Sequence, residues 1–354
     1  MASSEPATAP PARRTHQGRW LQAGPGRYHR CRSTPLPAAR FCAPPGHPWL
    51  DEGLQPKPPT QAQHERSTMH ENTLISPEQL QTLMTSLPTV VIDTRAPGAY
   101  AKGHIPGAVN IHEIFTYLAT SDTEGMATLK GKFAEAFGAA GLSGEEVAVL
   151  YEDTMNSGYG QSCRGYFLLK YLGYPKAVVL HGGYQAWVHD GYETSTEVVT
   201  PQPKTFPVDD GAAEIMLDKD AMLKALEDPS IIKLDVRDVD EWVGISSSPY
   251  GVDFCPRKGR LPGAKWLEWY RVMKPGDDVP VFKTKDELAA EFQSVGIKAS
   301  SKVYLYCFKG ARASNTYVAL KEAGVEDVGI YFGSWNEWSR DPSLPIDESR
   351  PTLS

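Results

Sequence analysis

The sequence predicts an α/β protein with two similar domains, each built on a parallel sheet flanked by helices, after a disordered N-terminal segment. Three observations support this prediction. Short motifs from the middle of the chain return in the same order in its second half. In both copies, short apolar runs alternate with helical stretches. The first seventy or so residues follow neither pattern, so they are not expected to bury a core.

The composition is that of a globular protein large enough for two domains. Of the 354 residues, 41% are apolar and 22% are charged. No apolar run approaches the roughly 20 residues needed to span a bilayer, so no membrane association is expected. The formal net charge of −7 disfavours a nucleic acid as partner, because phosphate binding needs clustered Lys and Arg.

The cysteines are scattered along the chain, with no C-x-x-C pair and no histidine cluster at metal-ligand spacing. They are Cys31, Cys42, Cys163, Cys255 and Cys307. We therefore expect reduced thiols, no metal and no other cofactor, in a cytoplasmic protein. We also expect a monomer. One of the free thiols is a candidate reactive group.

Residues 1–72 form the leading segment. Its first fifty residues hold seven arginines and one acidic residue, Glu5, with recurrent prolines and no apolar periodicity. An arginine-rich, acid-poor composition is one property of organelle-targeting peptides, although the prolines would interrupt their amphipathic helix. The interpretation that we favour is that Met69 is the working initiator. A chain that starts at Met69 is then expected to fold and turn over like the full-length protein.

Two pairs of motifs carry the internal repeat; the first pair shares its D-x-R residues, and the second shares its glycine and proline positions. They are VVIDTRAPGAY (90–100) with IKLDVRDVDEW (232–242), and GHIPGAVNI (103–111) with GRLPGAKWL (259–267). The second copy has an insertion, Gly244–Lys258, between its two motifs. After the insertion the copies agree within one residue as far as the next strand, which places Glu152 opposite Cys307.

Within each copy, the apolar runs have the length of strands and the stretches between them have helical periodicity. In the first copy the expected strands are VVID (90–93), VAVLY (147–151) and AVVL (177–180), and the expected helices are 164–173 and 184–191. The predicted domains are 73–198 and 212–347, and the proline-rich stretch 199–211 is the predicted linker. Parallel sheets of this kind bind ligands at the carboxyl ends of their strands.

Cys307 directly follows the apolar strand VYLY (303–306) and begins a short loop, CFKGAR, that opens a helix. Gly324 is the expected end of this helix. Free backbone N–H groups at the start of the helix, together with Lys309 and Arg312, would lower the pKa of the thiol and hold an anion. Because a thiolate nucleophile needs both properties, Cys307 is the candidate catalytic residue.

This loop resembles the active-site loop of the rhodanese family. The repeat around it also carries the family's D-x-R, G-H-I-P-G-A and G-S-W-x-E-W motifs, and the resemblance covers residues 73–347. The resemblance implies two rhodanese-like domains, the second catalytic and the first inactive because Glu152 replaces the cysteine. It implies that Cys307 accepts a sulfur atom, holds it as a persulfide and passes it to cyanide or a thiol. The loop residues that would bind the substrate are Phe308, Lys309, Gly310, Ala311 and Arg312.

The resemblance also bears on the sulfur donor, for which we expect thiosulfate. Lys309 matches the lysine of thiosulfate-using tandem members, and Arg312 resembles the loop arginine of many single-domain members. Members specific for 3-mercaptopyruvate carry a Cys-Gly-Ser-Gly-Val-Thr loop, which this chain lacks. Glu241 departs from the tandem pattern, since it stands where thiosulfate enzymes have a substrate arginine. 3-Mercaptopyruvate is therefore the alternative donor, and we expect Glu241 to turn away and brace local structure.

Two further motifs are assigned supporting roles. Asp235 and Arg237 are expected to form an ion pair that supports the loop from the end of a strand, as Asp93 and Arg95 would in the first domain. His104 is expected to stabilise a turn through a hydrogen bond rather than to transfer a proton.

The other cysteines and the loop tip complete the predictions. Cys163 is expected to be structural. Cys255, in the insertion, is expected to be structural too, with the alternative that it approaches Cys307 and resolves an oxidised state. Phe308 is expected to be exposed at the loop tip and to line the acceptor entrance.

Two other classes of function use a similar loop or fold. A cysteine-dependent phosphatase needs five residues between its cysteine and arginine to encircle a phosphate, and four separate Cys307 from Arg312. A non-catalytic binding module is the other alternative. The presence of Cys307, Lys309 and Arg312 together argues against it for the whole chain.

Overall fold

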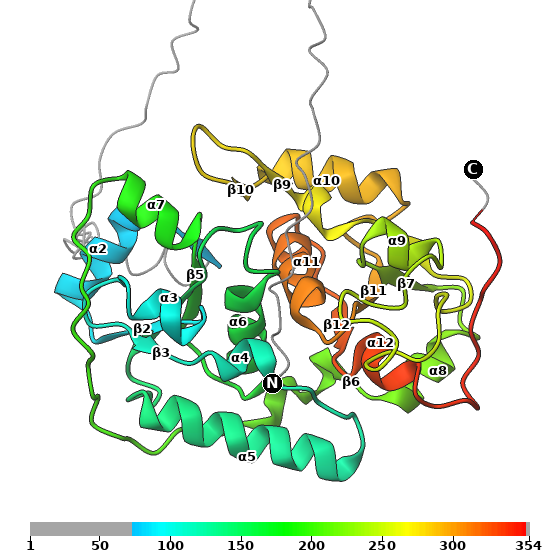
Figure 1. The fold of residues 1–354 in the computed structure, drawn as a ribbon, viewed down its shortest axis with the longest axis horizontal. Helices are drawn as coiled ribbons and strands as arrows, with labels where there is room; N and C mark the ends of the chain where they lie inside the picture. The colour runs from blue at the N-terminus through cyan, green and yellow to red at the C-terminus, as the bar shows by residue number, and fades with distance from the viewer. Residues whose placement is uncertain (1–72, 352–354) are drawn as a thin grey trace, which may run out of the picture. The chain divides into compact units, whose positions relative to one another are not determined.

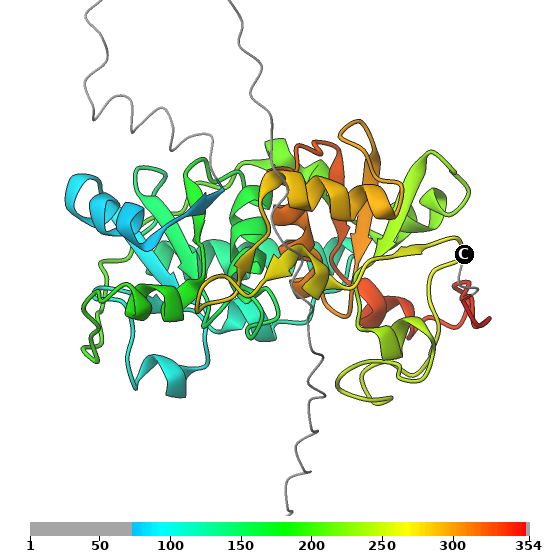
Figure 2. The same cartoon turned by 90° about the horizontal axis from the view of Figure 1, so that it is seen from above.

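The computed structural model describes residues 73–351 and shows two parallel sheets flanked by helices (Figures 1 and 2). The predicted fold class is thereby confirmed. The predictions for residues 1–72, including Met69 as initiator, lie outside the described residues.

The first sheet has the strand order β1-β5-β4-β2-β3, and all its neighbouring strands are parallel. Its strands are β1 (Leu74–Ile75), β2 (Thr89–Asp93), β3 (Val109–Asn110), β4 (Val147–Tyr151) and β5 (Ala177–Leu180). The helices of this domain are α2 (Pro77–Ser86), α3 (Pro97–Tyr100), α4 (Glu113–Thr116), α5 (Thr123–Ala139), α6 (Gln161–Tyr171) and α7 (Gly183–His189).

The second sheet repeats this order as β6-β12-β11-β7-β8, again with parallel neighbours. Its strands are β6 (Met216–Leu217), β7 (Ile231–Asp235), β8 (Lys265–Trp266), β11 (Lys302–Tyr306) and β12 (Val328–Tyr331). An antiparallel pair, β9 (Met273–Lys274) and β10 (Val281–Phe282), lies between β8 and β11 in the chain. The helices are α8 (Lys219–Ala225), α9 (Val239–Trp242), α10 (Lys285–Ser294), α11 (Ala311–Glu322) and α12 (Ser334–Trp338), with short 3₁₀ turns η1 (Asp210–Ile215) and η2 (Trp269–Val272).

Local signals in the sequence explain where several helices begin. Ser76 and Gln79 form a capping box at the start of α2, and Thr284 and Glu287 form one at the start of α10. Asp122 accepts a hydrogen bond from a backbone N–H in the first turn of α5. Each box pairs N–H groups that the first turn of a helix leaves unbonded.

Helices α6 and α11 pack side by side between the two sheets (Figure 1). Phe167 of α6 contacts Tyr317 of α11 edge-on, with ring centroids 5.1 Å apart. At the start of α6 the backbone of Gly160 approaches α11 so closely that a Cβ there would lie 2.7 Å from the carbonyl oxygen of Ala311. A side chain at this position would push the helices apart. The packing therefore brings the first domain against the beginning of α11, next to Cys307.

The segment between the domains packs onto the first one. Phe206 is buried, and its ring lies 5.6 Å from that of Phe137 and 5.3 Å from that of Tyr174. Lys204 donates its backbone N–H to the carbonyl of Gly138 and pairs with Glu146. The proline-rich linker is thus held to the first domain by apolar and polar contacts.

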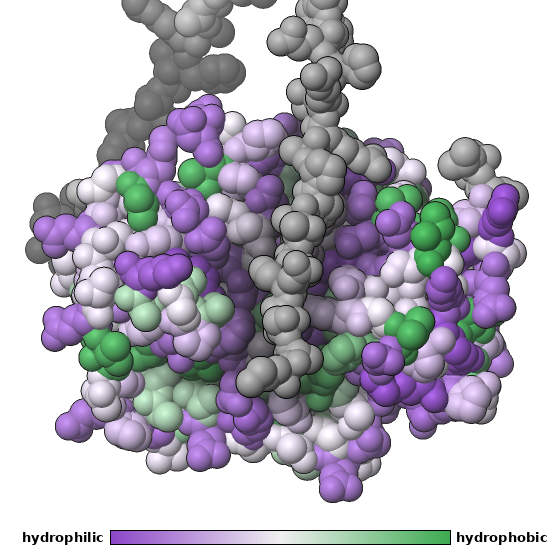
Figure 3. Space-filling view, in the orientation of Figure 1, coloured by the Kyte–Doolittle hydropathy of each residue, from purple (hydrophilic) through white to green (hydrophobic). Residues whose placement is uncertain are grey.

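The surface seen in Figure 3 is mainly hydrophilic, with hydrophobic residues in scattered patches. Ile245, Val252 and Phe254 are exposed side chains of the insertion. Among residues 73–351, no helix combines the length and the apolar character required to cross a bilayer.

A buried ion pair lies at the end of β7, next to the strand that leads to Cys307. Arg237 donates to both carboxylate oxygens of Asp235, with a shortest distance of 2.6 Å, and both side chains are fully buried. Tyr306, the last residue of β11, donates its hydroxyl to Asp235 at 2.6 Å. Arg237 also donates to the carbonyl of Gly259 and lies over the ring of Trp335. The pair thereby joins two strands, a loop and α12.

The first domain contains the same arrangement. Arg95 donates to both oxygens of Asp93, Tyr151 donates its hydroxyl to Asp93 at 2.6 Å, and Arg95 also bonds the carbonyl of Gly103. Because the first domain lacks a cysteine at the strand end, the repeated pair belongs to the architecture of the fold.

We expect Asp235→Asn to lower the free energy of unfolding by about 3–5 kcal/mol, because it leaves the buried Arg237 without its counter-ion. The matched control is Asp327→Asn, which removes an exposed partner of Lys302 and should change stability by less than about 1 kcal/mol. Denaturant unfolding of both variants and the parent measures these differences. Equal stability of the two variants would contradict the proposed importance of the buried pair.

Candidate active site

Cys307 lies at the carboxyl end of β11 and begins the four-residue loop that leads into α11. It is 1% exposed, and its Sγ accepts a hydrogen bond from the backbone N–H of Gly310 at 3.1 Å. The backbone N–H of Cys307 donates to the hydroxyl of Ser334 at 3.2 Å, and its carbonyl accepts from the N–H of Trp335 at 3.0 Å. The sulfur is thus fixed in position and faced by a backbone donor, as a thiolate requires.

Gly310 is required at the turn for two reasons. Its φ is +90°, in the left-handed region that side chains rarely adopt. A Cβ there would also lie 2.8 Å from the ring of Phe332. The glycine therefore allows its N–H to point at Sγ of Cys307.

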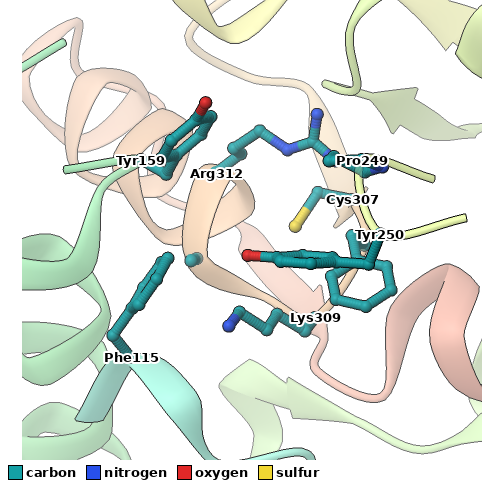
Figure 4. Close-up of a pocket in the computed structure, with 9 residues that line it drawn as sticks. Phe115, Tyr159, Pro249, Tyr250, Cys307, Lys309 and Arg312 are labelled. Carbon is teal, nitrogen blue, oxygen red and sulfur yellow. The ribbon is translucent and has the colours of Figure 1, made fainter. Parts of the chain in front are cut away.

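A cavity of about 230 Å³ opens beside Cys307 (Figure 4). It is lined by residues of both domains and of the insertion, namely Phe115, Tyr159, Pro249, Tyr250, Cys307, Phe308, Lys309, Ala311 and Arg312. Sequence reasoning did not find the first four of these. The insertion in the second copy was the available signal for Pro249 and Tyr250, whereas nothing in the sequence links Phe115 or Tyr159 to Cys307.

The insertion is anchored so that Tyr250 reaches the cavity. Arg257 donates to the carbonyls of Trp338, Ser339 and Leu344 at 2.8–2.9 Å. The ring of Tyr250 packs on that of Phe308, with centroids 4.8 Å apart.

Phe308 is 4% exposed, so the prediction of an exposed loop tip is wrong. The rings of Tyr250 and Phe254 cover it, and both belong to the insertion. The side chain does line the cavity, as expected, but as part of its apolar wall.

Arg312 is almost completely buried and lies between two carboxylates. It donates to both oxygens of Glu241, at 2.6 and 3.1 Å, and lies 3.1 Å from Asp238. Burial lowers the pKa of Arg312, but the attraction of Glu241 outweighs it and holds the pKa above the usual value. Glu241 also accepts the backbone N–H of Asp238 in a capping box, so it braces local structure and points at Arg312. The charge of Arg312 is therefore already balanced.

Lys309 lies in the cavity without a carboxylate. None of the ion pairs found in residues 73–351 includes it, and its side chain is 8% exposed. Its Nζ lies 3.9 Å from the ring centroid of Phe115 and 5.5 Å from that of Tyr250. Burial, followed by the neighbouring guanidinium of Arg164, lowers the pKa of Lys309 to about 8.

The first domain has a corresponding loop with a carboxylate in place of the sulfur. Glu152 follows β4 as Cys307 follows β11, and its Oε2 accepts the backbone N–H of Gln161 at 2.8 Å. Seven residues lie between Glu152 and the left-handed Gly160, whereas two lie between Cys307 and Gly310. Burial raises the pKa of Glu152 to about 8, against the opposing effect of the backbone N–H groups.

The remaining residues considered from the sequence lie outside the cavity lining. Cys163 and Cys255 are buried; burial raises the pKa of Cys163 well above its usual value and that of Cys255 to about 11. Both ring nitrogens of His104 lie within hydrogen-bonding distance of backbone carbonyls, those of Tyr100 and Glu197, at 2.8 and 3.0 Å. Asp235 and Arg237 do not line the cavity and contact the loop region only through neighbouring residues.

The chain is similar to known proteins over most of its length. A family model described as Rhodanese-like domain matches residues 76–190 and 218–341. A thiosulfate sulfurtransferase of Azotobacter vinelandii is 27% identical over 276 residues, which is 77% of this chain and 96% of that protein. The sulfur carrier protein TtuD of Thermus thermophilus is 28% identical over 253 residues, covering 70% of this chain and 86% of that protein.

Among solved structures, a variant of EanB in complex with ergothioneine is similar, with a TM-score of 0.68 and 25% identity. The match covers 80% of this chain and 72% of that one. The wild-type structure of EanB gives a TM-score of 0.67 at the same identity, covering 80% of this chain and 71% of that one.

We expect Glu152 to make folding less favourable as pH rises. Its pKa is about 8 in the folded protein and lies near 4.5 when it is exposed, so the folded state keeps a proton that the unfolded state releases between these values. Stability should therefore fall by about 3–5 kcal/mol across this pH window on account of this group.

Glu152→Gln should remove that part of the pH dependence, because the amide keeps an oxygen for the N–H of Gln161 and has no proton to lose. Denaturant unfolding at several pH values compares the variant with the parent. Glu145→Gln, at an exposed carboxylate, is the control and should leave the slope unchanged. A parent and a Glu152→Gln protein with the same pH slope would show that the carboxyl is not buried in its neutral form.

Proposed function

The chain belongs to the rhodanese family and is a sulfurtransferase, and from this premise we propose that it is a thiosulfate sulfurtransferase that works through a persulfide on Cys307. The observation that supports this proposal most directly is the loop at Cys307. A buried sulfur faces the backbone N–H of Gly310 at the wall of a cavity that also contains Lys309. The loop suits a nucleophile that alternates between a thiolate and a persulfide.

In the proposed first half-reaction the thiolate of Cys307 attacks the outer sulfur of thiosulfate. A new S–S bond forms on Cys307, the S–S bond of thiosulfate breaks, and sulfite leaves with the bonding electron pair. The charge that grows on sulfite needs a cation nearby. Lys309 is placed for this role, and preorganised charges at such positions typically lower a barrier by about 3–4 kcal/mol.

The arrangement of Glu241 favours thiosulfate over the alternative donor, 3-mercaptopyruvate. A carboxylate that faced the cavity would repel a dianion. Glu241 instead contacts Arg312 with both oxygens and is itself buried. Lys309 is then the cation in the cavity lining without a carboxylate partner among residues 73–351.

In the second half-reaction the outer sulfur moves from Cys307 to cyanide or to a thiol. The acceptor bonds to this sulfur, the persulfide S–S bond breaks, and Cys307 leaves as a thiolate. The N–H of Gly310, 3.1 Å from Sγ, would stabilise the charge that returns to the sulfur.

Cys307→Ser should abolish sulfur transfer, whereas Cys163→Ser and Cys255→Ser should retain most of it. Of the three cysteines within residues 73–351, Cys307 alone lines the cavity, and burial raises the pKa values of Cys163 and Cys255. Mass spectrometry after treatment with thiosulfate should detect one added sulfur atom in the parent and in the last two variants. Loss of turnover in a folded Cys163→Ser or Cys255→Ser protein would overturn the assignment.

Lys309→Ser should lower kcat/KM for thiosulfate at least about tenfold and kcat/KM for 3-mercaptopyruvate much less, because the dianionic donor depends more on the cation. In the parent, thiosulfate should be the better donor. Because each kcat/KM in a ping-pong reaction reports the half-reaction of its own substrate, cyanide can serve as the common acceptor. A parent that prefers 3-mercaptopyruvate, or an equal loss for both donors, would contradict the role of Lys309.

A further inference from the structure

We propose that Lys309 also acts in the second half-reaction, as the base that takes the proton from an acceptor thiol, and that Phe115 of the first domain positions its amine. The inference rests on the proposed function, because it requires a persulfide on Cys307. Lys309 would thus act as an ammonium ion toward the sulfur donor and as a neutral amine toward the acceptor thiol.

The surroundings of Lys309 differ from those of the other buried cations among the described residues. Each of the other buried cations bonds a carboxylate or a backbone carbonyl. The carboxylate partners belong to Arg95, Arg237, Arg260 and Arg312, and the carbonyl partners to Arg164 and Lys233. Lys309 instead contacts the faces of two aromatic rings, and the nearer one, Phe115, belongs to α4 of the first domain. Aromatic rings stabilise a buried ammonium group less than a carboxylate does, so the neutral amine of Lys309 can be populated.

The surroundings of the Lys309 amine have opposing effects on its protonation. Burial and the guanidinium groups of Arg164 on α6 and Arg312 on α11 disfavour the ammonium form, while Cys307 at the end of β11 favours it. The hydroxyl of Tyr250 faces the same space (Figure 4), and burial raises the pKa of that group, so it is neutral. With a pKa of about 8, Lys309 populates both forms near neutral pH, whereas an exposed lysine would be almost fully charged.

The second half-reaction creates a need for such a base when the acceptor is a thiol. The thiolate is the nucleophile, yet an ordinary alkyl thiol, with a pKa of about 8.5, is mostly protonated at neutral pH. Phe115, Pro249, Phe308 and Ala311 of the cavity lining cannot accept a proton, and Arg312 is permanently charged. Tyr159 and Tyr250 also line the cavity, but a phenol hydroxyl is a far weaker base than an amine. Of the lining residues other than Cys307 itself, the neutral amine of Lys309 is therefore the suitable acceptor.

The proposed step balances in protons and electrons. Neutral Lys309 takes the proton of the thiol, and the thiolate attacks the outer sulfur of the Cys307 persulfide. The new S–S bond forms on the acceptor, the persulfide bond breaks, and its electron pair stays on Cys307 as a thiolate. Lys309 is then an ammonium beside a Cys307 thiolate that carries no extra sulfur. In this state the site can accept the next thiosulfate dianion. After that donor reacts, the departing sulfite or solvent carries the proton away.

Lys309→Arg separates the two roles, because arginine keeps the positive charge but cannot act as a base. In the experiment, polysulfide loads the Cys307 persulfide of the full chain, excess reagent is removed, and discharge is followed after mixing with one of two small acceptors at neutral pH. Mercaptoethanol is mostly protonated under these conditions, and thioacetate is fully ionised. We expect Lys309→Arg to slow discharge by mercaptoethanol at least about tenfold and discharge by thioacetate by less than about threefold.

Two further variants accompany this measurement. Phe115→Leu keeps the cavity apolar but removes the ring under the amine, and it should slow mercaptoethanol more than thioacetate. Lys302→Arg, the same substitution at a partly exposed lysine paired with Asp327, is the control and should match the parent with both acceptors.

The inference is overturned if Lys309→Arg slows both acceptors equally or neither of them. The thiosulfate reaction is measured separately in the same proteins. If thiosulfate fails to load Cys307 while polysulfide-loaded protein still shows the selective loss with mercaptoethanol, the proposed donor is wrong and the role of Lys309 as a base stands.

Discussion

The close packing of α6 against α11 is the contact on which the candidate site depends. It is possible only because Gly160 has no side chain where its backbone meets Ala311. This contact places Phe115 and Tyr159 of the first domain at the wall of the Cys307 cavity. The domain without a cysteine therefore completes the site of the domain that has one, and a change that separated the two helices would open the cavity even if each domain stayed folded.

The two cations of the site, Arg312 and Lys309, differ in whether a carboxylate pairs with them. Glu241 and Asp238 balance the charge of Arg312, and that arrangement fixes the guanidinium as a structural group. Lys309 has aromatic neighbours instead, so its protonation remains sensitive to what enters the cavity. Arg312 therefore carries a permanent charge that is neutralised by its carboxylate partners and shapes the site. Lys309 carries a charge that depends on its protonation, so it can take part in the chemistry.

The two copies of the repeat show how one architecture supports two outcomes. In both, the residue that follows the central strand accepts a backbone N–H at the start of the next helix: Glu152 accepts from Gln161, and Cys307 from Gly310. The first-domain loop is five residues longer, and its carboxyl is buried and raised in pKa. The same donor geometry therefore holds a neutral structural acid in one copy and a candidate nucleophile in the other.

The sequence by itself determined the two-domain α/β fold and the position of Cys307, because both depend on periodicity, repetition and a loop that are local in the chain. It also predicted that Glu241 braces local structure, because the E-W pair at this position follows the pattern of single-domain members of the family. Only the tertiary structure decided that Phe308 is buried, because the insertion folds over it, and that Phe115 lies against Lys309. The protonation of a lysine depends on burial and on neighbours from segments far away in the chain, and no local pattern encodes which segments those are.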